Sequence, residues 1–195
     1  MKWARFNYTN GTQKSPSPYI YLQAWEICLR NKINDFLTWK YNEGWPYEND
    51  RAVRNLKGDD RRRLSETILR QERDRSVRPV STAVIVADLS AGFWVSQLSA
   101  NYESHYKWRY NKARVFAHNA KLDHNEAWAI CDELLTLRNR VAHHEPVFHL
   151  PLDERRKNLA NIVSAMCPAT SAFAEATCNF EAIWAERPKP KKAEA

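Results

Sequence analysis

Apolar side chains recur at helical spacing along most of this chain. Between residues 19 and 41 they cover one broad face of a helix, and comparable patterns predict helices over about 123–144, over about 151–166 and from Thr170 to Trp184. Glycine occurs only 4 times in 195 residues, which argues against a turn-rich sheet protein. The pattern therefore predicts an all-α fold with no significant sheet.

The middle of the chain gives less regular signals. Residues 51–78 predict a thinly packed pair of helices, broken and capped at Gly58-Asp59-Asp60. The most apolar stretch runs from Val84 to about Ser99, and a strand is an alternative there. We predict one buried helix because of its length and because the chain offers no plausible partner strand. Residues 101–121 predict a connector.

At 195 residues the chain is most simply one domain with its own core. We predict an N-terminal arm at residues 1–17, a single helical domain at residues 18–186 and a disordered basic tail at residues 187–195. The cysteines lie in apolar helical contexts without a Cys-x-x-Cys pair, so we expect them to be reduced. Without a signal peptide or a long apolar run, we expect a cytoplasmic protein and no membrane span.

Basic side chains outnumber acidic ones, which gives a formal charge of +7 and a pI of about 9.3. RNA is a partner that such a charge favours, although a solubilising surface charge has the same composition. Residues 51–78 are rich in arginine, and residues 101–121 interleave basic with aromatic side chains. The alternatives are a solvated helical face for the first stretch and aromatics buried in the core for the second. The candidate RNA-binding residues are Arg61, Arg62, Arg63, Tyr106, Lys107, Trp108 and Arg109.

The chemistry-bearing residues lie at the end of the helix predicted over 123–144. Asn139 and His143 are four apart and share a face, and Arg138 flanks them. Arginine binds phosphate oxygens in a fork, and histidine exchanges protons near neutral pH. Spacing alone leaves a plain alternative, in which these residues and His144 cap a helix end. Adjacent histidines point to different sides of a helix, so we expect no metal site.

RNA cleavage without metal needs a base for the ribose 2′-hydroxyl, an acid for the leaving 5′-oxygen and a fixed cation for the phosphate. One histidine cannot easily fill both proton roles. A two-fold dimer would bring two copies of Arg138 and His143 to one cleft. We therefore expect a homodimer with a composite active site.

The string Leu137-Arg138-Asn139-Arg140-Val141-Ala142-His143-His144-Glu145-Pro146 resembles the signature of the HEPN superfamily, and more narrowly its Abi-like (abortive infection) branch. Further resemblance spans roughly residues 19–188 in the right order. The segments that carry it are Glu26–Asn31, Asp88–Val95, and the stretch from Cys167 to Pro188.

This resemblance implies a HEPN-type helical bundle with additional helices, usually dimeric. It implies a metal-independent endoribonuclease without a cofactor, which leaves 2′,3′-cyclic phosphate ends and acts in phage defence or as a toxin. Arg138 and His143 would be the catalytic pair, Asn139 their polar partner, and Glu26, Arg30, Asn31 and His144 supporting residues. The implied partners are RNA, a second copy, and an antitoxin or small RNA.

One position departs from the family. Some HEPN toxins carry a tyrosine two residues after the histidine, which a partner nucleotidyltransferase uses to neutralise them, whereas Glu145 stands here. We therefore expect no such partner. Two other functions stay open: a non-cleaving protein that holds a structured RNA, and a helical interaction protein whose Arg138–His143 end only caps a bundle.

Overall fold

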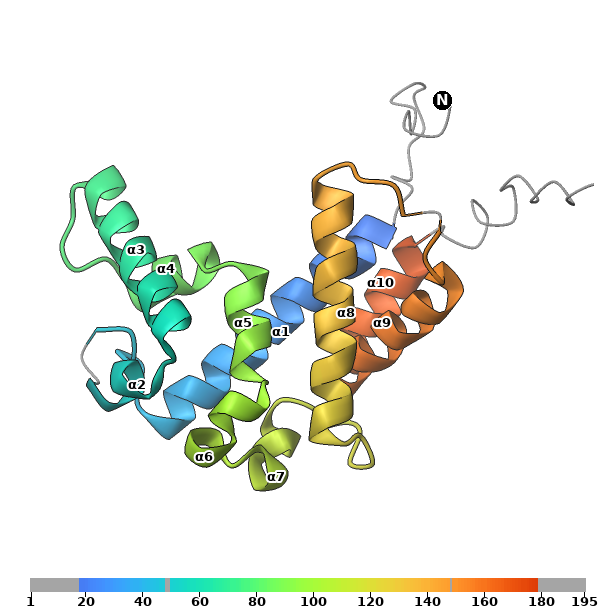
Figure 1. The fold of residues 1–195 in the computed structure, drawn as a ribbon, viewed down its shortest axis with the longest axis horizontal. Coiled ribbons are helices and arrows are strands. Elements are labelled where there is room, and N and C mark those ends of the chain that lie inside the picture. Colours follow the sequence, from blue (N-terminus) through green and yellow to red (C-terminus); the bar gives the residue numbers. More distant parts are fainter. Residues whose placement is uncertain (1–17, 48–49, 148, 179–195) are drawn as a thin grey trace, which may run out of the picture.

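The computed structural model describes residues 18–47, 50–147 and 149–178, and within these ranges the chain forms helices and no strands (Figure 1). The predicted all-α class is confirmed. The predicted arm at 1–17, the tail at 187–195 and the reach of the last helix to Trp184 lie outside the described residues. In chain order the elements are α1 (Pro18–Lys40), α2 (Asp50–Asn55), α3 (Gly58–Arg75), α4 (Thr82–Asp88), α5 (Ala91–Gln97), η1 (Ala100–Tyr102), α6 (Glu103–Tyr106), α7 (Trp108–Asn111), η2 (Lys112–Arg114), α8 (His124–Ala142), α9 (Leu152–Met166) and α10 (Pro168–Thr177).

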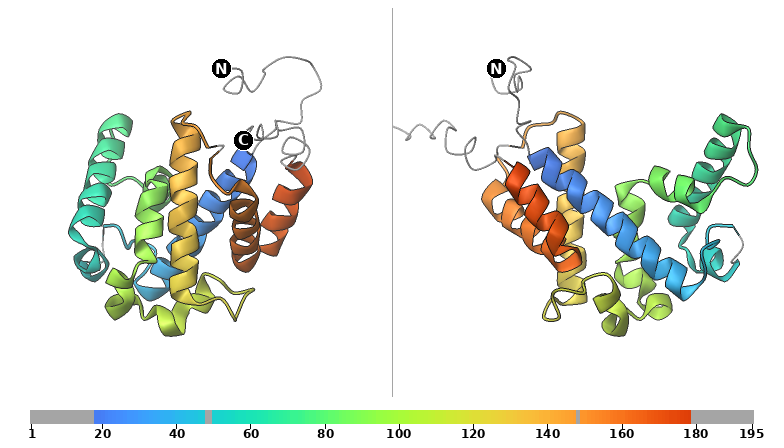
Figure 2. Two further views of the ribbon diagram at one scale, coloured as in Figure 1. Left: turned by 45° about the vertical axis from the view of Figure 1, so that its right-hand side comes forward. Right: turned by 180° about the vertical axis from the view of Figure 1, so that it is seen from behind.

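Helix α1 is the central element. It crosses the molecule diagonally and contacts α5, α8, α9 and α10, as the view from behind in Figure 2 makes clear. Its inward face buries Trp25, Ile33 and Phe36 almost completely. Because apolar burial is the dominant stabilising term, this face fixes the position of the other helices around α1.

Helix α8 begins and ends close to its predicted bounds. Asp123 is the N-cap, and its Oδ1 accepts a hydrogen bond of 2.8 Å from the backbone N–H of Asn125. The helix ends at Ala142, slightly before the predicted end at residue 144. His143 is the C-cap, and His144 adopts the left-handed conformation with φ 56°.

The single helix predicted from Val84 to Ser99 is wrong. Two short helices, α4 and α5, form instead, because Leu89 is extended and Ser90 caps α5 by accepting the backbone N–H of Phe93. At the break, the buried carbonyl of Leu89 accepts a hydrogen bond of 3.3 Å from the indole N–H of Trp94. It allows α4 to contact α3 while α5 contacts α1 and α8.

Two predicted RNA-binding side chains are core residues. Tyr106 and Trp108 are both 0% exposed and pack against the ring of Phe36. The Tyr106 hydroxyl donates to the Gln97 side chain and the Trp108 indole N–H to the Gln97 carbonyl, each at 2.9 Å. Since neither ring is open to solvent, neither can stack on an RNA base. The alternative of buried aromatics is correct for these two residues.

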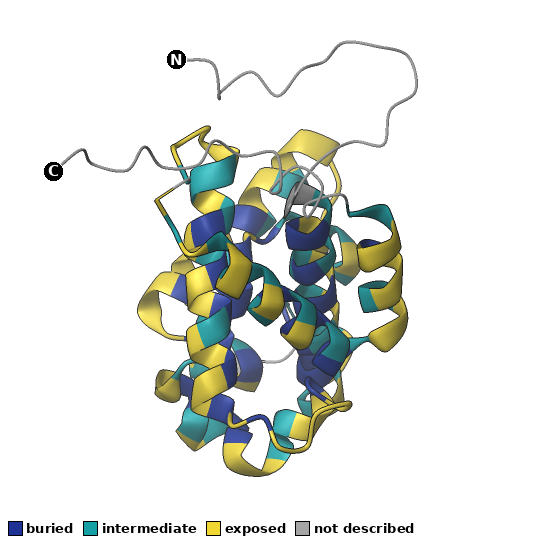
Figure 3. Cartoon of the chain, turned by 90° about the vertical axis from the view of Figure 1, so that its right-hand side faces the viewer, coloured by how far each residue is buried: buried dark blue, intermediate teal, exposed yellow. Residues whose placement is uncertain are grey.

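Figure 3 shows that buried residues face the interior of the bundle while exposed residues cover its outer side. No helix in the described ranges is both long and apolar enough to cross a membrane. The same part of the chain contains no group of three or more His, Cys, Asp and Glu side chains that could hold a metal ion.

Candidate active site

An ion pair between Glu26 and Arg138 joins α1 to α8. Arg138 Nε donates to Glu26 Oε2 at 3.0 Å, and an Nη atom lies 3.5 Å from Oε1, although the two residues are 112 positions apart. The Arg138 side chain is 36% exposed and that of Glu26 27%. Both residues are predicted site residues, and the fold brings them into direct contact at the surface.

The ion pair orients Arg138 without using all of its donors. The other Nη atom donates to Asn139 Oδ1 at 3.4 Å. A guanidinium carries five N–H groups, and these contacts engage three of them. The remaining N–H groups are available to an oxyanion at a half-exposed position. Glu26 therefore both fixes the plane of the guanidinium and offsets part of its charge.

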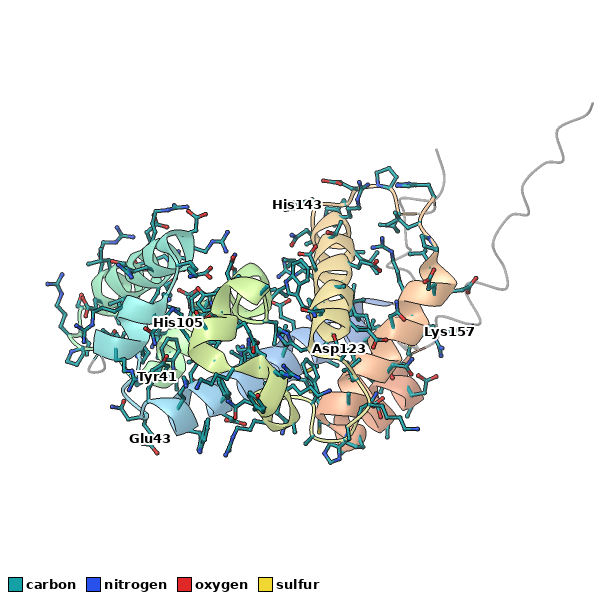
Figure 4. All side chains as sticks on the ribbon, turned by 60° about the horizontal axis from the view of Figure 1, so that its bottom comes forward. Tyr41, Glu43, His105, Asp123, His143 and Lys157 are labelled. Carbon is teal, nitrogen blue, oxygen red and sulfur yellow. The ribbon has the colours of Figure 1, made fainter. Side chains whose placement is uncertain are left out.

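His143 lies at the exposed end of α8. Its backbone N–H donates to the carbonyl of Asn139 at 2.9 Å, so it continues the helical hydrogen bonding by one residue. His144 then turns the chain, and the N–H of Glu145 donates to the Arg140 carbonyl at 2.8 Å. In Figure 4 His143 lies at the opposite end of α8 from Asp123. Arg138, Asn139 and His143 thus lie within the last two turns of one anchored helix and its C-cap.

The other supporting residues on α1 lie one turn beyond Glu26. Arg30 Nε donates to Asn31 Oδ1 at 3.3 Å, and the carboxylate of Glu26 contacts Arg138. Arg30 is half-buried and Asn31 is exposed. Of the predicted α1 residues, Glu26 is the one for which the structure gives a direct contact with the α8 site.

The three predicted arginines of α3 are exposed but make local contacts. Arg61 donates to backbone carbonyls at the end of α2, Arg62 pairs with Asp59 and Glu66, and Arg63 pairs with Asp60. Such pairs reduce the net positive field of this helix. Arg61, Arg62 and Arg63 stay predictions as RNA contacts. Lys107 and Arg109, from the second predicted stretch, are exposed.

Sequence reasoning missed a buried polar cluster around Asp60. Its side chain is 4% exposed, and its Oδ2 accepts hydrogen bonds from Ser96 Oγ at 2.5 Å, Gln97 Nε2 at 3.1 Å and the Tyr102 hydroxyl at 2.7 Å. Burial raises the pKa of Tyr102 well above its usual value. The cluster fastens α3 to α5 and η1. An acidic residue in a first helical turn is common, so the sequence carries no signal of burial.

One hollow among the described residues lies against α3 and α4, away from the end of α8. It is an open depression of about 410 Å³ between α3 and α4, lined in part by Gln71, Arg75, Val84 and Asp88. Asp88 accepts hydrogen bonds from Arg70 and Gln71, and the Arg70 and Gln71 donors hold the pKa of that carboxyl below its usual value against the effect of burial. The residues that line this depression do not include Arg138, Asn139 or His143.

Comparison of the chain with protein-family models, with curated proteins and with solved structures finds no match. The resemblance to the HEPN superfamily therefore rests on the residues quoted above, and the HEPN type of this bundle stays a prediction.

Proposed function

We propose that this chain is a metal-independent endoribonuclease of an antiviral (abortive infection) or toxin system, with its chemistry at the exposed end of α8. The observation that carries the proposal is the contact between Glu26 and Arg138. Two segments that separately resemble HEPN motifs meet there, and His143 follows Arg138 by five positions at the end of the same helix. If Arg138 and His143 only capped the end of α8, a carboxylate from another helix would not be needed at this position.

Two copies of these residues can perform each part of such a reaction. A ribose 2′-oxygen attacks the adjacent phosphorus, its proton passes to a histidine, and the 5′-oxygen leaves with a proton from an acid. The products are a 2′,3′-cyclic phosphate and a 5′-hydroxyl. The donors that Glu26 leaves open on Arg138 bind the phosphate oxygens, and Asn139 helps to hold them in place.

A second copy completes the site in this proposal. His143 can be either base or acid in one turnover, and the partner's copy fills the other role across a two-fold axis. The exposure of His143 at a helix end leaves it accessible to such a partner. Cleavage should therefore depend on protein concentration in the range where the dimer dissociates.

The test is cleavage of RNA by purified protein in EDTA. We expect fragments with cyclic phosphate ends, and a loss of about 10²- to 10⁴-fold in rate for His143→Ala. His118→Ala is the matched control, because His118 is also exposed and lies outside α8. Fragments equally abundant from wild type and His143→Ala would contradict the proposal.

A second function, a protein that holds a structured RNA without cutting it, is favoured by one observation. Lys107, Arg109 and Tyr110 are exposed, and together they offer cations and an aromatic face to RNA. In this case RNA co-purifies intact, and binding is steeply salt-dependent. An antitoxin or small RNA as the bound partner belongs to the same proposal, and RNA recovered from the purified protein and sequenced identifies it.

A further inference from the structure

A surface at the far end of α1 gathers exposed aromatic rings and cations. We call it the aromatic-basic surface. It comprises Trp39 and Lys40 of α1, Arg51 of α2, Lys107 between α6 and α7, Arg109 and Tyr110 of α7, and Arg114 of η2. Figure 1 shows α1 ending near α2, and α6 and α7 side by side at the same edge of the molecule.

Two aromatic rings of this surface are exposed to solvent, although an aromatic side chain close to them is buried in the core. Trp39 is 51% exposed and Tyr110 is 76% exposed, whereas Trp108 between them in the chain is fully buried. Trp39 is anchored on one side by Phe36, with ring centroids 5.8 Å apart. Exposure leaves part of each ring accessible to a ligand, while the packing of Trp39 against Phe36 holds that ring in place.

Arginines lie against both open rings. The guanidinium carbon of Arg114 is 3.5 Å from the centroid of Trp39, and that of Arg109 is 6.0 Å from the centroid of Tyr110. Each pair combines a flat π face with a fixed positive charge. This is the combination that binds a stacked base together with its phosphate.

The cations of this surface repel one another. Partial burial lowers the pKa of Lys40, and the neighbouring charges of Arg51 and Lys107 lower it further. Acidic residues on the same elements are fewer, and one of them, Glu103, accepts the backbone N–H of Arg109 at 3.4 Å. The repulsion between Lys40 and these neighbouring cations is relieved when an anion binds between them.

We infer that the aromatic-basic surface binds single-stranded RNA, with bases on Trp39 and Tyr110 and phosphates at Lys107, Arg109 and Arg114. A duplex hides the faces of its bases and would leave the rings unused. An acidic peptide or an anionic membrane would engage the cations but would not use the arginine-backed ring faces. The inference takes RNA as ligand in line with the proposed function, but it does not need cleavage.

The surface shares α1 with Glu26, which contacts Arg138 of the proposed active site. Trp39 follows Glu26 by 13 positions, which is roughly 20 Å along α1. At 3.6 residues per turn the two side chains lie roughly 140° apart around α1, so one RNA strand that contacts both has to pass around this helix. The surface then determines which RNA is retained, while Arg138 and His143 determine whether it is cut.

The test measures RNA binding by full-length His143→Ala protein in EDTA, so that no cleavage interferes. The probe is a fluorescein-labelled oligouridine of about 15 nucleotides followed by anisotropy, with a matching duplex as second probe. We expect Trp39→Ala with Tyr110→Ala to weaken binding by about 5- to 150-fold per stacked base. Arg109→Gln with Arg114→Gln should lower the slope of log affinity against log salt by about 1.4.

Controls separate stacking from misfolding. Trp128→Ala removes another exposed tryptophan, from α8, and should leave RNA affinity unchanged. Tyr110→Ala alone changes a side chain that is mostly in solvent, so its loss of affinity is not explained by unfolding. Wild-type affinity in the Trp39→Ala, Tyr110→Ala protein would overturn the inference. Equal affinity for the duplex, or binding to phosphatidylserine vesicles without binding to RNA, would overturn it too.

These outcomes are distinct from those of the proposed function. RNA that binds at Trp39 and Tyr110 but is never cut by wild type contradicts the ribonuclease and leaves the surface intact. RNA that is cut as fast by the Trp39→Ala, Tyr110→Ala protein, at concentrations below the dissociation constant, contradicts the surface and leaves the ribonuclease intact.

Discussion

Glu26 and Arg138 face each other across α1 and α8, with Nε and one Nη of the arginine directed at the two carboxylate oxygens. Glu26 engages one side of the guanidinium, and two N–H groups of Arg138 are not used by its contacts with Glu26 and Asn139. It couples the geometry of the proposed site to the central helix. Its energetic and functional consequences can be separated experimentally.

Replacing Glu26 by Gln should affect cleavage far more than folding. The pair is partly exposed, so screening limits its contribution to the free energy of unfolding to at most about 1 kcal/mol. Loss of the guanidinium orientation should lower the cleavage rate by about 10- to 100-fold. Urea denaturation of Glu26→Gln, Arg138→Gln and the double variant measures the free energy of unfolding. RNA cleavage by the same proteins measures the rate. A cleavage rate for Glu26→Gln equal to wild type would contradict an orienting role.

Asp60 should be among the most sensitive side chains for stability. Asp60→Ala leaves the donors of Ser96, Gln97 and Tyr102 without their acceptor in the core, and we expect a loss of about 3 kcal/mol or more in the free energy of unfolding. Asp59→Ala is the matched control. Its side chain is exposed, and its pair with Arg62 spans 3.7 Å, so the change should stay within about 0.5 kcal/mol. Urea denaturation distinguishes the two, and equal losses would contradict this account.

Stability should fall with pH below about 6.5 because of His124. Burial lowers the pKa of this side chain below the usual 6.5, so the unfolded chain takes up the proton first as pH falls. The contribution of neutral His124 is full above pH 6.5 and is lost as pH drops toward the folded pKa. The pKa values of the Asp88 and Asp123 carboxyls are also lowered from 3.8, so their contributions to stability are lost only at lower pH, as the pH falls below 3.8.

The measurement is the free energy of unfolding between pH 7.5 and pH 5. His124→Gln should flatten the decline, whereas His118→Gln, at an exposed position, should keep it. A decline that persists unchanged in His124→Gln would assign the pH dependence to other groups.

Cys167 should be alkylated before the buried cysteines. The Thr170 hydroxyl donates to its sulfur at 3.2 Å, and this bond together with backbone N–H groups at the start of α10 lowers the pKa of the Cys167 thiol. Burial raises the pKa of Cys28, and raises that of Cys131 to about 12. Iodoacetamide at pH 8 with peptide mass spectrometry gives the order of labelling. Thr170→Val should slow labelling at Cys167, and faster labelling of Cys131 would contradict the prediction.

Long periodic patterns predicted the fold well where tertiary contacts agree with them. The helices α1, α8 and α9 each present one apolar stripe, and their bounds lie within a few residues of the prediction. The break before α5 was missed because the Ser90 hydroxyl caps a new helix inside an apolar run, and periodicity does not register one hydroxyl. Short elements such as α6 and α7 have no period, so nothing local distinguishes buried Trp108 from exposed Tyr110.

The sequence predicted the part of the site that lies on one helix, but not the contacts between separate elements. Arg138, Asn139 and His143 share a helix end by spacing alone, and α8 places them together. The resemblance placed Glu26 at the same cleft as Arg138, but their direct contact was not predicted, since no local pattern links positions on separate helices. The stacking of Arg114 on Trp39 had no sequence signal, because it depends on how η2 lies against the end of α1.

Helix α1 is continuous from Pro18 to Lys40, about 35 Å in length, and its buried side contacts the core on four other helices. It therefore fixes the distance between Trp39 and Glu26. An RNA strand held at Trp39 would meet the end of α8 at a constant offset, so cleavage should fall at a set number of nucleotides from the stacked bases rather than at a set sequence. Lengthening or kinking α1 would move the cut.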